Sequence, residues 1–215
     1  MRIVEPSFAF ESPVDREEIL KHLERAGRTC YKSEGKIGDG TAAAFVRSVV
    51  KRGHESVLEH VSLTVRVVCD RGVSHEIVRH RLASYSQEST RYCNYGDGKF
   101  GNQVSFVRPC FWQEDTPEAK EKLRIWTESM QAAENAYLAL LAQGATPQEA
   151  RSVLPNSLRT ELVMTMDLRE WRHFLKLRSD RASHPQMREL AVPMLAGFRL
   201  LLPELFEDLG DAASY

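Results

Sequence analysis

Residues 61–68 read Val-Ser-Leu-Thr-Val-Arg-Val-Val, and this stretch decides the fold class. Apolar side chains stand at positions 61, 63, 65 and 67, and polar side chains stand between them. Because successive side chains of a strand point to opposite faces, the alternation predicts a strand with one face on a core. Residues 158–166 alternate in the same way. The sequence therefore predicts a sheet that contains both strands.

Helical patterns surround these two strands. We expect helices over residues 12–27, 41–52, 72–83, 115–144, 146–153, 168–177 and 185–209, and a short strand over 103–108. Pro193 and Pro203 are expected to kink or split the last helix. Residues 84–91 lack apolar periodicity and predict an irregular loop. The pattern indicates an α+β fold, with one domain over residues 1–215 and a central, mostly antiparallel sheet flanked by helices.

Two glycine clusters bear on whether the fold binds a dinucleotide in the Rossmann manner. The cluster at residues 38–43 follows a polar segment, whereas the fingerprint requires a buried strand there. The cluster at residues 96–101 precedes a strand instead of a helix. Both clusters are interpreted as loops, and a Rossmann fold is not expected.

Composition restricts the class of protein. The 215 residues are 42% hydrophobic and 27% charged, which is typical of a globular protein. The formal net charge of −1 provides no overall field for nucleic acid, so an anion site must be local. The four cysteines form no Cys-x-x-Cys pair and indicate reduced thiols. With no signal-peptide pattern and no apolar run of about 20 residues, we expect a cytoplasmic protein without membrane association.

Residues 79–91 read Arg-His-Arg-Leu-Ala-Ser-Tyr-Ser-Gln-Glu-Ser-Thr-Arg. Guanidinium groups present paired donors and stay charged, so together with hydroxyls they suit phosphate oxygens. A solvated helix end would explain one or two basic residues but not the polar run that follows. The segment therefore predicts an anion site.

The same segment resembles the flavin-dependent thymidylate synthase family, in which Arg-His-Arg and a serine are separated by seven residues, here Arg79-His80-Arg81 and Ser89. Three other blocks resemble the family in the same order. They are Gly53-His54-Glu55-Ser56 with Glu59-His60, Ala150-Arg151-Ser152-Val153-Leu154-Pro155, and Phe174-Leu175-Lys176-Leu177-Arg178. The resemblance covers roughly residues 27–190.

This resemblance implies an enzyme, a methyltransferase that converts dUMP to dTMP. Methylenetetrahydrofolate would supply the carbon, FAD would carry the hydride and NADPH would reduce the flavin. The uracil ring would be activated electrostatically, without an enzyme nucleophile. The family also implies a homotetramer with active sites at subunit interfaces, and no nucleic-acid partner.

The resemblance assigns roles to individual residues. Contacts with FAD are implied for Ser56, Arg79, His80, Arg81, Gln87, Asp167, Leu168, Arg169 and His173. Contacts with the nucleotide are implied for Glu76, Arg79, Gln87, Glu88, Ser89, Thr90, Arg91, Arg151 and Arg178. Arg178 would face the uracil as the catalytic residue, and Arg151 would come from another subunit. Asp167 and His173 stand where the family has asparagines, and Glu76 where it has glutamine.

The sequence also bears on two alternative chemistries, a metal site and a cysteine nucleophile. His54 and His60 are six residues apart and would lie on different faces of a helix, so no metal site is expected. Cys110 follows Pro109 as in the unrelated thymidylate synthases, which use a cysteine nucleophile. No motif that would activate a thiol surrounds it, so Cys110 is interpreted as a small buried group.

The alternative function is a non-catalytic protein that binds phosphate-rich ligands such as single-stranded RNA. Trp112, Trp126 and Trp171 would then stack on bases. The net charge opposes this hypothesis, and the spacing of Trp171, Phe174 and Leu177 predicts core positions. A yellow flavin absorbance in the purified protein would distinguish the enzyme from the binder.

Overall fold

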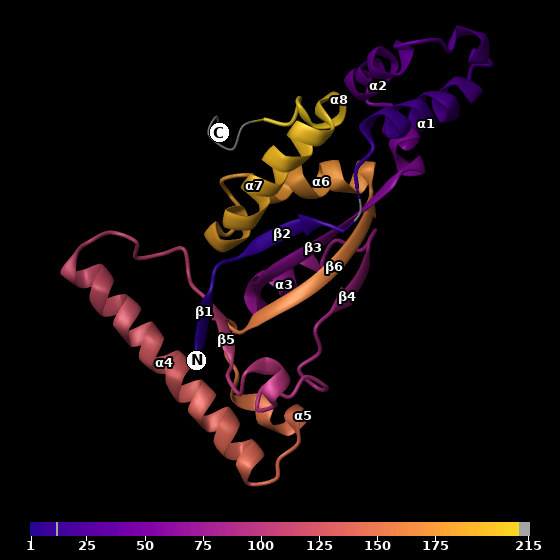
Figure 1. Ribbon diagram of the computed structural model, residues 1–215. Helices are drawn as coiled ribbons and strands as arrows, with labels where there is room; N and C mark the ends of the chain where they lie inside the picture. Colours follow the sequence, from indigo (N-terminus) through magenta and orange to yellow (C-terminus); the bar gives the residue numbers. More distant parts are fainter. Residues whose placement is uncertain (12, 211–215) are drawn as a thin grey trace. The chain divides into compact units, whose positions relative to one another are not determined.

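The computed structural model describes residues 1–11 and 13–210 (Figure 1). The strands are β1 (Arg2–Val4), β2 (Ser7–Phe10), β3 (Ser62–Asp70), β4 (Ser84–Gln87), β5 (Ser105–Val107) and β6 (Arg159–Asp167). The α-helices are α1 (Arg16–Thr29), α2 (Thr41–Lys51), α3 (Arg71–Ile77), α4 (Pro117–Ala142), α5 (Pro147–Ala150), α6 (Leu168–Arg178), α7 (Pro185–Leu201) and α8 (Pro203–Phe206). Short 3₁₀ helices are η1 (Glu34–Lys36), η2 (Glu55–His60), η3 (Gly98–Phe100) and η4 (Arg151–Val153).

The chain forms two compact units. Unit 1 contains Met1–Ser7, Val67–Arg79 and Ser86–Leu162. Unit 2 contains Phe8–Arg66, His80–Tyr85 and the segment from Val163 onward. The expectation of one domain over the whole chain stays a prediction.

The main sheet is antiparallel and has the strand order β2–β3–β6–β4. A second, two-stranded sheet pairs β1 with β5 in parallel, with Ile3 opposite Phe106. Side chains of β3 and β6 alternate between buried and less buried positions. These findings confirm the strands predicted from residues 61–68 and 158–166, and the α+β class.

Unit 2 has an aromatic core. Trp171, Phe174 and Phe198 are fully buried, and the indole Nε1 of Trp171 donates a hydrogen bond to the Leu63 carbonyl at 3.0 Å. The core position predicted for Leu177 is wrong, because this side chain is 46% exposed. Leu177 follows Trp171 by six residues, which is about 240° around a helix and outside the buried face.

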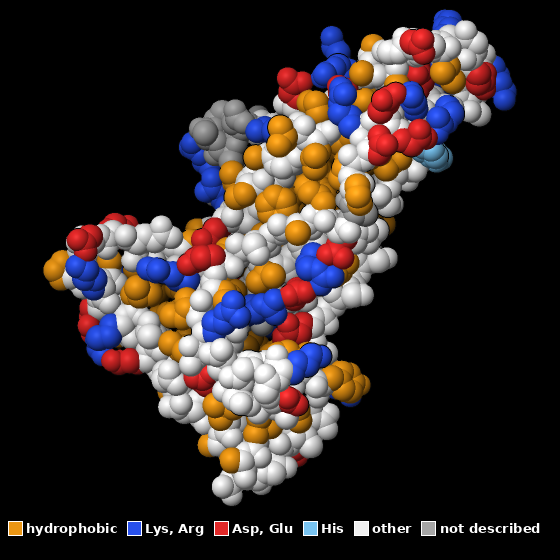
Figure 2. All heavy atoms as spheres, viewed as in Figure 1, with side chains coloured by type: hydrophobic (Ala, Val, Ile, Leu, Met, Phe, Trp, Pro, Cys, Tyr) orange, Lys and Arg blue, Asp and Glu red, His pale blue; other side chains and the backbone are white. Residues whose placement is uncertain are grey.

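Helices α1 and α2 lie side by side within unit 2. Helix α1 begins after Asp15, whose side chain accepts a hydrogen bond from the Glu18 amide at 3.0 Å, and the start predicted at Ser12 lies outside the described residues. Gly27 permits a close approach, because a Cβ atom there would come within 2.7 Å of the Phe45 ring. Figure 2 shows charges of both signs interspersed over these two helices.

Unit 1 has a separate core beneath α4. Phe106 and Tyr137 are fully buried in it. The buried Glu134 carboxylate on α4 accepts a hydrogen bond from the Val104 amide at 2.8 Å and pairs with the amino terminus of Met1 at 2.7 Å. This contact fixes the start of β1 against α4.

Two expectations near the signature segment are wrong. Residues 84–91 are not entirely irregular, because strand β4 covers Ser84–Gln87 at an edge of the sheet. Helix α3 ends at Ile77 rather than at residue 83. The His80 carbonyl, which would continue that helix, instead accepts a hydrogen bond from the Tyr85 hydroxyl at 2.8 Å.

The prolines act differently in the last helical segment. Pro193 lies inside α7, whereas Leu202 separates α7 from α8, which begins at Pro203. In residues 1–11 and 13–210, no helix combines the length and apolarity required to cross a membrane.

Candidate active site

The residues predicted for the site fall in both units, and each group is described by itself. Unit 1 holds Glu76, Arg79, Gln87, Glu88, Ser89, Thr90, Arg91 and Arg151. Unit 2 holds Ser56, His80, Arg81, Asp167, Leu168, Arg169, His173 and Arg178.

The loop after β4 brings together four of the predicted residues of unit 1. The Ser89 hydroxyl accepts a hydrogen bond from the Arg91 amide at 3.3 Å. Arg151 Nη1 donates to Thr90 Oγ1 at 3.2 Å. Arg91 and Arg151 are exposed. One chain therefore supplies two guanidinium groups and two hydroxyls in unit 1, with the Arg151 guanidinium in contact with Thr90, and the prediction that Arg151 acts from another subunit stays a prediction.

Gln87 and Glu88 secure the end of β4 to β6. The Gln87 amide nitrogen donates to Ser74 Oγ at 3.0 Å and to Thr160 Oγ1 at 3.2 Å. The Glu88 carboxylate accepts hydrogen bonds from the Tyr95 hydroxyl at 2.6 Å and from Arg159 at 2.7 Å. Glu88 also lines a polar cavity of about 590 Å³ in unit 1.

Helix α3 and its C-terminal turn carry Glu76 and Arg79. The helix is capped by Asp70, whose side chain accepts a hydrogen bond from the Val73 amide at 2.7 Å. The Arg79 amide donates to the Glu76 carbonyl at 3.3 Å, which closes the last turn. Arg79 is exposed, so its guanidinium is accessible to an anion.

Two predicted side chains, Arg178 and His80, and the neighbouring Glu170 form a hydrogen-bonded chain in unit 2. Arg178 Nε donates to His80 Nε2 at 3.0 Å. His80 Nδ1 lies 3.1 Å from Glu170 Oε1. The His80 ring also packs edge-on against Phe174, with a centroid distance of 4.8 Å. His80 and Glu170 are buried, and Arg178 is half-buried.

The protonation state of His80 follows from these contacts. A guanidinium nitrogen only donates, so His80 Nε2 must accept, and the ring proton resides on Nδ1 and is donated to Glu170. Burial lowers the pKa of His80, and the Arg178 charge acts in the same direction, while the hydrogen bond with Glu170 opposes them. His80 is therefore neutral near pH 7.

The sequence interpretation missed Glu170. Glu170, Phe174 and Arg178 are spaced four residues apart on α6 and so lie on one face of it. That spacing from Arg178 is the signal by which Glu170 could have been found.

Two cavities in unit 2 contain four of the predicted flavin contacts, whereas Leu168 is fully buried and lines neither cavity. A cavity of about 900 Å³ is lined by Ser56 and Arg169. A second, of about 730 Å³, is lined by Asp167, Arg169 and His173. Both cavities share Arg169 and Glu55, so they adjoin. Arg169 pairs with Glu59 at 2.5 Å, which holds its guanidinium between η2 and α6.

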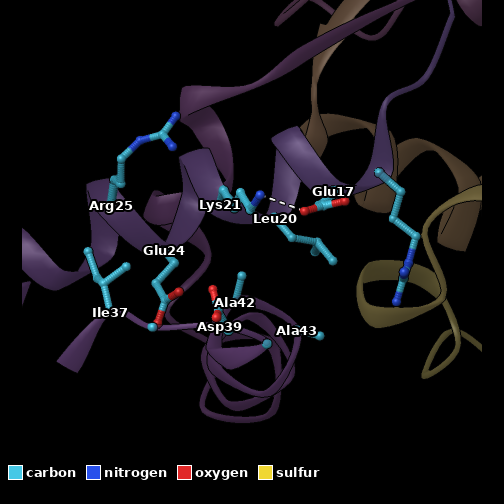
Figure 3. Close-up of a pocket in the computed structure, with 12 residues that line it drawn as sticks. Glu17, Leu20, Lys21, Glu24, Arg25, Ile37, Asp39, Ala42 and Ala43 are labelled. Carbon is cyan, nitrogen blue, oxygen red and sulfur yellow. Dashed lines mark hydrogen bonds and ion pairs between the residues drawn. The ribbon is translucent and has the colours of Figure 1, made fainter.

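A further cavity of about 590 Å³ lies between α1 and residues 37–43 (Figure 3). Lys21 and Glu17 on its wall pair at 2.5 Å. The buried Glu24 carboxylate accepts hydrogen bonds from Thr41 at 2.8 Å and from Arg28 at 2.7 Å. The predicted site residues line other parts of the described chain, so this cavity is not a candidate for the reaction.

Ligand atoms of His80, Glu170 and His173 lie within 4.8 Å of one another, as in a possible metal site. Both ring nitrogens of His80 are already engaged, however, and the Arg178 guanidinium beside them would repel a cation. The geometry favours the hydrogen-bonded chain.

Trp171 does not offer the stacking surface expected of an RNA-binding protein. Trp171 is fully buried and its indole nitrogen is bound, so its predicted stacking role is wrong. Trp126 is half-buried and donates to Ser157 Oγ at 3.2 Å.

Comparison with known proteins supports one family. Residues 14–204 match the family described as thymidylate synthase complementing protein. The flavin-dependent thymidylate synthase of Geobacter sulfurreducens is 39% identical over 194 residues, which cover 86% of this chain and 79% of the relative. The protein of the same name from Mycolicibacterium gilvum is 35% identical over 204 residues, which cover 86% of this chain and 78% of the relative.

Solved structures agree with the sequence matches. The UMP/dUMP methylase PolB from Streptomyces cacaoi, bound with 5-Br dUMP, has a TM-score of 0.78 and 26% identity, and the match covers 96% of each chain. The chain, with its Arg-His-Arg signature beside a serine loop, belongs to the flavin-dependent thymidylate synthase family.

Proposed function

We propose that this protein catalyses the reductive methylation of dUMP to dTMP. The proposed carbon donor is 5,10-methylenetetrahydrofolate, FAD carries the hydride and NADPH is the reductant. Family membership supports the reaction class, and the structural neighbour PolB is a dUMP methylase. The observation that carries the proposal is the contact of Arg178 with His80, which holds a fixed cation at the end of α6.

Arg178 supplies the proposed catalytic step. A guanidinium beside the uracil ring stabilises the ionised form of the ring and any negative charge that grows on it. The orientation of the guanidinium matters because such a donor lowers the reaction barrier most when it is already in place before the reaction. No enzyme nucleophile is required.

The loop after β4 is the proposed phosphate site. Ser89, Thr90 and Arg91 offer hydroxyl and guanidinium donors within one unit. Arg151 is proposed to reach the nucleotide from another subunit and to add a second guanidinium. These are the groups that bind phosphate oxygens with charge-assisted hydrogen bonds. Roles for Glu76, Arg79, Gln87 and Glu88 in holding the nucleotide rest on the family resemblance.

The adjoining cavities of unit 2 fit the flavin. Their volumes of about 900 Å³ and about 730 Å³ lie in the range of ligand pockets. The larger cavity presents Arg28, Lys36 and Arg52 in addition to Arg169, and these cations suit a diphosphate. Tyr31, which is exposed and lines the same cavity, offers an aromatic surface for an adenine. When bound there, FAD would supply the hydride.

We further propose a homotetramer with active sites at subunit interfaces, as in the family. Light scattering of the purified protein measures its mass directly, and a stable monomer would contradict this part of the proposal.

The reaction itself is tested by flavin reoxidation. The purified, photoreduced protein is mixed without oxygen with dUMP and methylenetetrahydrofolate. The proposal expects the flavin to reoxidise with formation of dTMP, and expects no reoxidation when dUMP is omitted. A colourless protein that binds single-stranded RNA in a salt-sensitive manner would instead support the alternative function.

A further inference from the structure

Glu170 occupies an unusual place for a residue of the first helical turn. Asp167 caps α6 by accepting a hydrogen bond from the Glu170 amide at 2.8 Å. A glutamate at this third position commonly returns its carboxylate to the backbone of the capping residue, forming a capping box. Here the carboxylate instead lies 3.1 Å from Nδ1 of His80.

The Glu170 carboxylate is buried, with 7% of the residue exposed, and His80 is equally buried with 6% exposed. Burying a carboxylate is costly unless hydrogen bonds compensate it. A capping role alone would leave the carboxylate near solvent at the helix end. The burial therefore points to the contact with His80 as the reason for a glutamate at this position.

We propose that Glu170 is a positioning residue that orients Arg178 through His80. Its effect on catalysis rests on the proposed function, whereas its effect on the His80 ring does not. The carboxylate accepts a hydrogen bond from Nδ1–H, which keeps the ring proton on Nδ1 and leaves the lone pair on Nε2. That lone pair accepts the Arg178 Nε–H at 3.0 Å and fixes the plane of the guanidinium.

Neighbouring groups restrict the His80 ring further. Phe174 packs edge-on against it at 4.8 Å, and the His173 ring lies 5.6 Å away. The Tyr85 hydroxyl donates to the His80 carbonyl at 2.8 Å and holds the backbone. The His80 ring is therefore packed against Phe174, and its Nδ1 and Nε2 atoms are hydrogen-bonded to Glu170 and Arg178, respectively.

The first test measures the ring directly. Nitrogen NMR of the protein labelled with ¹⁵N-histidine, assigned with His80→Gln, reports which nitrogen of His80 carries the proton. We expect the proton on Nδ1 in the wild type. In Glu170→Met, which has a similar length but no acceptor, only the Arg178 donor still favours this tautomer, so we expect the preference for Nδ1 to weaken, and an unchanged preference would overturn the proposal. A wild-type proton on Nε2 would overturn the proposal.

The second test is a double-mutant cycle on single-turnover flavin reoxidation. Glu170→Met should lower the rate by about 10- to 100-fold, because a small misplacement of a catalytic group is that costly. Glu170→Gln retains an acceptor oxygen and should recover most of the rate. In an Arg178→Lys background, which has no Nε–H, Glu170→Met should cost less than about twofold, because the two changes act on one interaction. Equal losses in both backgrounds, or no recovery with glutamine, would refute the route through Arg178.

A matched control separates positioning from folding. Glu134→Met removes a carboxylate of similar burial in unit 1, where 3% of the residue is exposed. Its unfolding temperature shows what such a loss costs in stability, and its reoxidation rate should stay near the wild type. If wild-type protein fails to methylate dUMP while the NMR result holds, the proposed function fails and the arrangement of His80 stands.

Discussion

The Nε atom of Arg178 lies 3.0 Å from the Nε2 atom of His80, and this hydrogen bond exists only while the imidazole is neutral. Protonation would place an N–H on both sides of the contact. Protonation of His80 therefore breaks this contact, which links the orientation of Arg178 to pH.

Stability should fall as the solution becomes acidic because of His80. Burial, aided by the Arg178 charge, lowers the pKa of His80 in the folded protein below the ordinary value of 6.5. The unfolded chain then binds more protons than the folded one below pH 6.5, so the stabilisation is complete above that pH and is lost as the pH falls through the folded pKa. Urea denaturation across this range should show a smaller loss for His80→Gln than for the wild type. Identical slopes would contradict the prediction.

Removal of Arg178 should lower turnover more than affinity. Its proposed role is to stabilise charge that grows during the reaction, and loss of one such donor elsewhere costs about 10²–10³ in rate. In Arg178→Ala the reduced flavin should therefore reoxidise slowly when both substrates are present, while NADPH should reduce the flavin at the normal rate. Arg178→Lys should recover the rate only in part, because an ammonium lacks the planar fork. A wild-type reoxidation rate, or a defect confined to the NADPH step, would exclude uracil activation.

Arg91→Ala should weaken dUMP binding while the protein stays yellow. A charge-assisted hydrogen bond contributes about 1.5–3 kcal/mol, which corresponds to roughly 10- to 100-fold in affinity. Calorimetric titration with dUMP measures the change. Arg124→Ala is a suitable control, because Arg124 is also exposed in unit 1 but pairs with Glu121 and Glu128 on α4. Unchanged affinity in Arg91→Ala would remove this residue from the phosphate site.

Cys110→Ala should retain thymidylate formation within several-fold of the wild type. The half-buried Cys110 follows β5 in unit 1, and the proposed activation of uracil is electrostatic. The measurement is dTMP formation by a folded, flavin-loaded variant. Complete loss of turnover would favour a cysteine nucleophile over the flavin mechanism.

Trp171→Phe should destabilise the protein by about 1–3 kcal/mol, because it leaves the buried Leu63 carbonyl without its donor. Urea denaturation gives the change in the free energy of unfolding. The same substitution at the half-buried Trp112 is the control and should cost less. Equal effects at the two positions would indicate that the Trp171 hydrogen bond is not a source of stability.

The sequence predicted those elements whose periodicity reflects burial. Strands β3 and β6 have one face on a core, so their apolar side chains alternate clearly. The edge strands β2 and β4 of the main sheet escaped detection. In β4 the exposed Ser84 and Ser86 alternate with half-buried Tyr85 and Gln87, a mixture too polar to register as a hydrophobic pattern. Strands β1 and β2 are three and four residues long, below the length at which alternation is informative.

The sequence allowed the residues of the candidate site to be predicted, but not the contacts between their side chains. Short motifs identified Arg178 and His80 separately, 98 residues apart in the chain. The contact between them depends on how the segment His80–Tyr85 and α6 are placed in unit 2, which no local pattern specifies. Glu170 was missed for a related reason: its sequence context is that of an ordinary helix start, and its spacing from Arg178 becomes informative only once the buried contact with His80 is known.

The absent side chain at Gly27 has a consequence for how this protein tolerates change. Glycine inside a helix is disfavoured relative to alanine by about 0.5–1 kcal/mol, so an alanine there would strengthen α1 considered alone. Its methyl group would meet the Phe45 ring at 2.7 Å, and Phe45 forms part of the wall of the larger cavity. A substitution that stabilises the helix would thus displace Phe45 in the cavity where the flavin is proposed to bind. A protein library screened only for thermal stability could therefore accumulate variants that fold well but bind no flavin and are colourless.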